Sequence, residues 1–217
     1  MSKKWYIYGA GGLGIETMDV LIDRLAHMRE DGVSCEFMDD QLKTDTKCGF
    51  PVVGFSDAVP GSQVTIAVGE PSIREVLCEK VRDAGLILSS VISPKAYISP
   101  LSEIGEGTII APFCSVQATA FVGANVVVNT GSIVGHDVEI KNDCVISSMV
   151  NLGGGVKIGR GSFCGMGALV KEDVAVGKSS IIGMGSVLYK DVPDGVIALG
   201  DPARVVRKND KRTVFGK

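Results

Sequence analysis

An aliphatic residue recurs at every sixth position from Ile92 to Leu188, with Cys164 as the one exception. The anchors are Ile92, Ile98, Ile104, Ile110, Val116, Val122, Val128, Val134, Ile140, Ile146, Leu152, Ile158, Cys164, Val170, Val176, Ile182 and Leu188. A helix repeats every 3.6 residues and a plain strand every 2, so neither produces a strict period of six. Short strands wound into a hexapeptide solenoid do produce it. The period therefore predicts a parallel β-solenoid over about half of the chain.

The residues between the anchors support this interpretation. The side chain four positions after each anchor is always small or Val: Ala96, Ser102, Thr108, Cys114, Ala120, Val126, Ser132 and onward to Val192. Alternation of a large anchor with a small residue suits the inside of a narrow triangular prism. Three hexads make one coil of eighteen residues, so the anchors should stack in three columns. One column would run through Ile92, Ile110, Val128, Ile146, Cys164 and Ile182, with successive coils paired as parallel strands.

Residues 1–88 follow a different pattern. Short apolar strands are expected at Trp5–Tyr8, Ser34–Met38 and Val64–Val68, with one helix after the first strand and another around Ser72–Arg82. This order, with glycines at the strand ends, predicts a small open parallel sheet, a truncated Rossmann-like unit. Ligands of such sheets lie beyond the carboxyl ends of the strands.

A glycine-rich loop follows the first predicted strand. Gly9, Gly11 and Gly14 fit the dinucleotide fingerprint GxGxxG, and Asp39-Asp40 lies roughly where a ribose-binding acid belongs. A full dinucleotide site normally needs two βαβ halves, and this domain has room for about one. Bare backbone N–H groups at a helix N-terminus attract phosphate. The loop is therefore a candidate phosphate or nucleotide site, with a purely structural turn as the alternative.

The chain contains two histidines, His27 and His136. His27 lies among charged residues late in the first predicted helix, where a solvated surface position is expected. His136 follows Gly135 in a predicted turn and precedes Asp137, which could hold the imidazole in one tautomer and make it more basic. Such a pair suits a general base, although a turn histidine can also be merely solvated.

Composition narrows the class of protein. The 217 residues carry a net charge of −3, which gives no global attraction to nucleic acid or to an anionic membrane. No apolar run approaches a transmembrane span or a signal-peptide core. The six cysteines show no CxxC spacing, so we expect no metal site and a reduced, cytoplasmic protein.

The chain resembles the family of sialic acid O-acetyltransferases and UDP-4-amino-sugar N-acetyltransferases, most closely the bacillosamine-pathway N-acetyltransferases. The segments that carry this resemblance are Tyr6–Gly14, Phe37–Asp40, Ala67–Arg74, Asn129–Asp137 and Asp191–Ala203. The resemblance covers nearly the whole length. It implies a left-handed parallel β-helix after the Rossmann-like domain, and an acetyl-CoA-dependent sugar N-acetyltransferase without a metal.

The resemblance also implies roles for individual residues. His136 would take a proton from the 4-amino group of a nucleotide-linked, UDP-type 4-amino-4,6-dideoxy sugar, and Asp137 would support it. The Gly154 N–H would face the developing oxyanion, and Met166 and Met184 would line the CoA channel. The nucleotide would be held by Gly12, Leu13, Gly14, Asp39, Asp40 and Gly69.

One position departs from the family. Members often carry a second histidine nine residues after the catalytic one, in contact with acetyl-CoA, and here that position is Val145. The family's CoA groove also needs two subunits, so a homotrimer is expected. The basic residues after Pro202 could touch CoA phosphates, but a solvated tail is the expectation.

These observations divide the chain into a nucleotide-sugar-binding domain (1–88), an acyltransferase β-helix (89–192) and a C-terminal tail (193–217). Two alternatives to amino-sugar acetylation remain open. One is O-acetylation of sialic acid on the same scaffold, and the other is a non-enzymatic binding protein. The His136-Asp137 pair argues against the latter.

Overall fold

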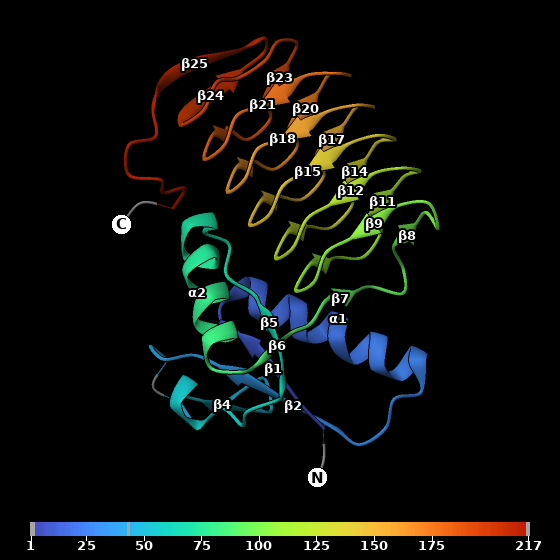
Figure 1. Cartoon of the computed structure of the whole chain (residues 1–217), viewed down its shortest axis with the longest axis vertical. Helices are drawn as coiled ribbons and strands as arrows, with labels where there is room; N and C mark the ends of the chain where they lie inside the picture. Colours follow the sequence, from blue (N-terminus) through green and yellow to red (C-terminus); the bar gives the residue numbers. More distant parts are fainter. Residues whose placement is uncertain (1–2, 43, 216–217) are drawn as a thin grey trace.

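The computed structural model describes residues 3–42 and 44–215, which form a small α/β domain followed by a β-solenoid (Figure 1). The predicted fold class is confirmed. No helix in these two ranges is long and apolar enough to span a membrane.

The amino-terminal domain is a twisted sheet with a helix on each side. Its elements are β1 (Lys3–Tyr8), α1 (Gly12–Met28), β2 (Val33–Met38), β3 (Thr46–Lys47), β4 (Phe50–Val53), η1 (Phe55–Asp57), β5 (Gln63–Ile66), α2 (Pro71–Asp83) and β6 (Ile87–Leu88). The strand order is β3-β4-β2-β1-β5-β6, and all neighbours are parallel except β3 and β4. Tyr6, Ile7 and Phe37 are fully buried at its centre. The sequence predicted β1, β2, β5 and both α-helices but missed the shorter elements.

Seventeen two-residue strands build the solenoid, and they form three faces. Face 1 comprises β7 (Val91–Ile92), β10 (Ile109–Ile110), β13 (Val127–Val128), β16 (Val145–Ile146), β19 (Phe163–Cys164) and β22 (Ile181–Ile182). Face 2 comprises β8 (Tyr97–Ile98), β11 (Ser115–Val116), β14 (Ile133–Val134), β17 (Asn151–Leu152), β20 (Leu169–Val170) and β23 (Val187–Leu188). Face 3 comprises β9 (Glu103–Ile104), β12 (Phe121–Val122), β15 (Glu139–Ile140), β18 (Lys157–Ile158) and β21 (Ala175–Val176).

The second residue of each strand is the anchor, and it points into the prism. Ile146 pairs in register with Val128 below it and Cys164 above it, and all three are fully buried. The predicted columns and their period of eighteen are therefore confirmed. The fully buried anchors and small residues form one continuous apolar core along the axis.

The outer sides of the three faces differ in what covers them. Val91, Ile109, Val127 and Val145 of face 1 form one buried cluster with apolar residues of α1. Face 2 instead leaves large apolar side chains in solvent, namely Tyr97, Ile133 and Leu169. Face 3 carries mainly charged or small outer residues, such as Glu139 and Lys157.

The turns between the faces define three edges. Edge 1–2 contains residues 129–131, 147–149, 165–167 and 183–185. Edge 2–3 contains residues 135–137, 153–155 and 171–173. Edge 3–1 contains residues 123–125, 141–143, 159–161 and 177–179.

The described basic side chains after Pro202 are exposed, as expected, but the backbone of this segment is not a free tail. β24 (Val196–Gly200) pairs in parallel with β22, and β25 (Ala203–Lys208) returns antiparallel to β24, so a hairpin extends face 1. Its strands cap the end of the solenoid that lies farthest from β7 (Figure 1). The side chains of Arg204 and Arg207 are exposed, but the backbone that carries them is ordered by the ladder to β24.

Candidate functional site

His136 lies in the turn between β14 and β15, on edge 2–3, and 65% of its side chain is exposed. Its Nδ1 is 2.7 Å from Oδ2 of Asp137. Asp137 has a left-handed φ of 58°, and its backbone N–H donates to the carbonyl of Ala118 one coil earlier. The turn therefore holds the imidazole and the carboxylate together on the outside of the prism.

Asp137 is further fixed by Thr119, whose hydroxyl donates to Oδ1 at 2.7 Å. The hydrogen bonds from Thr119 and His136 lower the pKa of Asp137 below its ordinary value. A carboxylate only accepts hydrogen bonds, so the proton of a neutral His136 lies on Nδ1 and Nε2 keeps a free lone pair. Sequence reasoning missed Thr119. It precedes Asp137 by eighteen residues, so the period of the repeat could have found it.

Gly154 lies one coil above His136, as the hydrogen bond from the Gly155 N–H to the His136 carbonyl shows (2.9 Å). A Cβ on Gly154 would lie 2.5 Å from both Nε2 and Cε1 of the imidazole. Only glycine fits this close approach. Within the described ranges, no hydrogen bond involves the Gly154 N–H. The free Nε2 of His136 therefore lies against Gly154.

Met166 and Met184 are exposed side chains on edge 1–2. They belong to neighbouring coils, because the N–H of Gly185 donates to the Met166 carbonyl at 2.9 Å. Face 2 separates them from His136, which lies on edge 2–3. A single chain therefore does not bring the predicted CoA-channel residues and the predicted base together.

The glycine-rich loop joins β1 to α1. Gly9 has φ 107° and donates its N–H to the carbonyl of Met38, and a Cβ on Gly14 would lie 1.9 Å from the Gly9 carbonyl oxygen. α1 begins at Gly12 without a side-chain cap. For the part of the chain that the structure describes, the N–H groups of Gly12, Leu13 and Gly14 have no hydrogen-bond acceptor. Three open donors at a helix N-terminus suit a phosphate.

Asp39 follows β2 and accepts a hydrogen bond from this loop. Its Oδ2 accepts the N–H of Ala10 at 3.0 Å, and its Oδ1 accepts the N–H groups of Gln41 and Leu42. The carboxylate therefore fixes both loops at the carboxyl edge of the sheet while remaining partly accessible.

Asp40 lies next to it in a polar cluster. It accepts hydrogen bonds from the Tyr8 hydroxyl (2.9 Å), the Lys80 ammonium (3.0 Å) and the Phe55 N–H (2.7 Å). Partial burial by itself would raise the pKa of Asp40, but these donors outweigh it and the pKa is lowered. Asp40 is thus an ionised, exposed acceptor at the predicted nucleotide edge.

Gly69, the last of the predicted substrate residues, follows β5 at the same edge. A Cβ on Gly69 would lie 3.4 Å from the ring of Phe215. Sequence reasoning missed this contact because no local pattern links the C-terminus to the first domain.

Val145, which replaces the family's second histidine, is 4% exposed and belongs to the apolar cluster between face 1 and α1. It therefore presents no polar atom to a ligand in this chain.

A cavity of about 190 Å³ lies between α1 and the solenoid. Leu13, Glu16 and Thr17 of α1 line one side, and Pro112, Asn129 and Thr130 line the other. The start of α1 therefore opens toward edge 1–2, and not toward the edge that carries His136.

Comparisons with known proteins show which family the chain is similar to. Residues 4–81 match the family model described as the PglD N-terminal domain. The chain is 29% identical over 212 residues to GDP-perosamine N-acetyltransferase of Escherichia coli O157:H7, a match that covers 94% of this chain and 96% of that protein.

Solved structures show the same likeness over the full length. The acetyltransferase domain of PglB from Neisseria gonorrhoeae is 31% identical with a TM-score of 0.86, covering 94% of this chain and 100% of that one. A variant of perosamine N-acetyltransferase from Caulobacter crescentus, in complex with CoA and GDP-perosamine, is 29% identical with a TM-score of 0.86, covering 95% and 98%. The chain belongs to the hexapeptide-repeat family of sugar N-acetyltransferases.

Proposed function

We propose that this protein transfers the acetyl group of acetyl-CoA to the amino group of a nucleotide-linked 4-amino-4,6-dideoxy sugar. The observation that carries this proposal is the His136–Asp137 pair, whose free Nε2 faces the backbone of Gly154. The relatives support it, because their names include sugar N-acetyltransferases and their structures include complexes with CoA and GDP-perosamine.

The geometry suggests how the reaction proceeds. The neutral sugar amine attacks the thioester carbonyl carbon, and Nε2 of His136 takes a proton from that nitrogen. The resulting imidazolium keeps its Nδ1–H bond to Asp137, whose negative charge stabilises it. The C–S bond then breaks, and the imidazolium returns the proton to the departing thiolate. The products are the amide and CoA with a free thiol.

The Gly154 N–H is the proposed oxyanion donor. Gly154 packs against the imidazole, so a thioester carbonyl bound at this residue would lie near the amine that Nε2 deprotonates. A preorganised backbone donor aimed at a developing oxyanion is typically worth about 10²–10³ in rate.

We further propose that the complete site forms between copies of this chain. His136 and Gly154 lie on edge 2–3, whereas Met166, Met184 and the mouth of the α1 cavity lie on edge 1–2. If three copies turn face 2 toward a common axis, edge 1–2 of one copy meets edge 2–3 of the next. The exposed Tyr97, Ile133 and Leu169 of face 2 give such an arrangement apolar surface to bury. The proposed assembly is a homotrimer with acetyl-CoA between the subunits.

The proposed acceptor is a UDP-linked sugar, held at its phosphates by the N–H groups of Gly12, Leu13 and Gly14 and at its nucleoside by Asp39, Asp40 and Gly69. The resemblance to bacillosamine-pathway enzymes favours UDP, and the GDP-perosamine enzymes make GDP the competing nucleotide.

All six cysteines are free thiols in the structure, which supports a reducing, cytoplasmic setting.

The protein is first titrated with UDP, GDP, dTDP and CMP to find which nucleotide raises its Tm. Thiol release from acetyl-CoA is then measured with UDP- and GDP-linked 4-amino sugars as acceptors. His136→Ala should lower kcat by about 10²–10⁴ while Tm and nucleotide binding stay unchanged. Asp137→Asn should lose a smaller factor. A His136→Ala protein that kept more than about half of the wild-type kcat would exclude the histidine as the base. If the protein acetylated sialic acid but no nucleotide-linked amine, the acceptor proposed here would be wrong and sialic acid would take its place.

A further inference from the structure

The C-terminal segment Asn209–Phe215 runs back from β25 to the amino-terminal domain. The amide of Asn209 donates to the Ser179 carbonyl on edge 3–1 at 2.9 Å. Arg212 then pairs with Glu75 of α2 at 2.8 Å. The segment is therefore attached at successive points along edge 3–1 and α2.

Its last described residues are anchored by Glu70, which precedes α2. The Glu70 carboxylate accepts the N–H of Val214 at 2.9 and 3.1 Å and the N–H of Phe215 at 3.2 Å. Glu70 is 8% exposed, so its charge is largely shielded from water and depends on these donors. This contact fixes the C-terminal backbone at the carboxyl edge of the sheet.

The anchored backbone places the Phe215 ring beside Gly69. The ring packs edge-to-face on Phe163 of face 1, with centroids 5.7 Å apart. Even so, 61% of Phe215 is exposed. Gly69 follows Ala67 and Val68, which themselves crowd Gly9 of the glycine-rich loop. An exposed aromatic ring therefore lies on the edge of the sheet where the nucleotide is proposed to bind.

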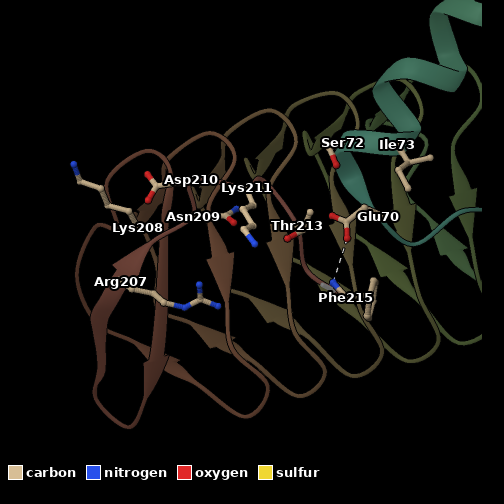
Figure 2. A pocket seen from close by; sticks show the side chains of 10 residues that line it. All are labelled: Glu70, Ser72, Ile73, Arg207, Lys208, Asn209, Asp210, Lys211, Thr213 and Phe215. Carbon is tan, nitrogen blue, oxygen red and sulfur yellow. Dashed lines mark hydrogen bonds between the residues drawn. The ribbon is translucent and has the colours of Figure 1, made fainter. Parts of the chain in front are cut away.

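A cavity of about 790 Å³ opens next to this ring (Figure 2). Its walls are the first turn of α2, with Ser72 and Ile73, and the segment from Arg207 to Phe215. Arg207 and Lys211 extend into the space between β25 and Phe215 in Figure 2, whereas Lys208 points away from it. The volume suits a ligand of nucleotide size, and the two cations suit an anionic one.

We propose that the segment Asn209–Phe215 forms one wall of the nucleotide-sugar site, in which Phe215 packs against the nucleoside part of the acceptor. This inference rests on the proposed function and adds a specificity-determining residue from the opposite end of the chain. Arg207 and Lys211 supply positive charge on the same side of the ligand. Glu70 is a positioning residue that holds the ring in place through the backbone of Val214 and Phe215.

The test compares nucleotide affinity in Phe215→Ala, Glu70→Ala and the control Phe121→Ala, which removes a partly exposed phenylalanine from face 3. The wild-type protein is first titrated with UDP and GDP, and the nucleotide that binds is used for every variant. Phe215→Ala should weaken its affinity about tenfold, because one stacking surface is lost. Glu70→Ala should give a similar loss. Phe121→Ala should match the wild type.

Steady-state kinetics separates a wall of the site from a general structural role. KM for the nucleotide sugar should rise in both site variants, while KM for acetyl-CoA and kcat at saturation stay near the wild-type values; Tm should stay unchanged in Phe215→Ala, whose side chain is exposed. Lys211→Gln should weaken binding about threefold at low salt and less at high salt. The control Lys157→Gln on face 3 should leave nucleotide affinity unchanged at both salt concentrations.

The outcomes distinguish this inference from the proposed function. If the wild-type protein acetylates a nucleotide sugar and Phe215→Ala binds the nucleotide with unchanged affinity, then Phe215 does not line the site. The proposed function would still stand. A wild-type protein that binds neither UDP nor GDP and acetylates no nucleotide sugar would overturn both.

Discussion

At the scale of the residue, two glycines are required by close contacts and not by conformational freedom. Gly154 has no side chain to collide with the His136 ring, and Gly14 lets α1 approach the carbonyl of Gly9. Both contacts lie under 3 Å from the position of a Cβ, so even alanine forces something to move. Substitution should have different effects at the two positions, because Gly154 contacts an exposed side chain and Gly14 contacts backbone.

Gly154→Ala should push the imidazole away from its bond with Asp137 and lower kcat by about 10²-fold or more, with little effect on Tm. His136 is exposed, so it can swing into solvent at low cost in stability. In a double-mutant cycle with His136→Ala, the two losses should not add, because both remove the same proton acceptor. Additive losses would show that Gly154 acts independently of the histidine.

Gly14→Ala should instead destabilise the amino-terminal domain by about 2–4 kcal/mol, because the new methyl group meets the carbonyl of Gly9 at 1.9 Å. Gly12→Ala is the matched control. A Cβ at Gly12 meets nothing within 4 Å, and alanine is the better helix former. Urea unfolding of both variants checks this, and equal midpoints would contradict the packing role of Gly14.

At the scale of the element, α2 is joined to the solenoid by a buried arginine. Arg74 is fully buried and donates to the carbonyl and side-chain oxygens of Asn125 on edge 3–1 and to the carbonyls of Ile66 and Val68. Asn125 in turn donates to Asp143 at 2.8 Å. Burial lowers the pKa of Arg74 to about 10, which leaves it charged at neutral pH.

Arg74→Met should therefore cost about 3–5 kcal/mol of stability, because it leaves several buried acceptors without a donor. The comparison is Arg82→Met, in the same helix. It breaks an exposed ion pair with Glu106 and should cost under about 1 kcal/mol. Calorimetry of the two variants measures the difference. Similar melting temperatures would mean that the arginine does not hold the two domains together.

The stacked columns make a second prediction at this scale. Ile146 is fully buried between coils, whereas Ile92 begins its column and is only partly buried. Ile146→Ala should cost about 2–5 kcal/mol through the cavity it leaves, and Ile92→Ala should cost less because fewer atoms surround it. Chemical unfolding of the two variants gives the comparison, and equal losses would argue against the stacking.

At the scale of the whole molecule, the sequence predicted what depends on local repetition. A period of six specifies the strands, the three faces and the outward turn of His136, because every coil repeats the same short-range rule. It could not show that the C-terminus returns to Glu70, since that contact joins residues 144 positions apart without a repeated pattern. The same period already separates His136 from Met166, because these residues follow anchors of different columns, Val134 and Cys164.

That separation of edges makes the assembly testable by mixing inactive subunits. His136→Ala removes the proposed base from edge 2–3. Gly12→Asp leaves the fold intact, because its Cβ lies in open space, but puts a carboxylate where the phosphates should bind. Each variant alone should be inactive, and light scattering should show each as a trimer of the 22.7 kDa chain.

Co-refolded in equal amounts, the two variants should recover about one quarter of the wild-type activity. If each site takes its histidine from one subunit and its glycine-rich loop from the next, random assembly pairs an intact histidine with an intact loop in about one quarter of the sites. The separately refolded proteins, mixed afterwards, serve as the control and should stay inactive while the trimers do not exchange. No recovery after co-refolding would place both parts of the site within one chain, and the edge-to-edge arrangement would be wrong.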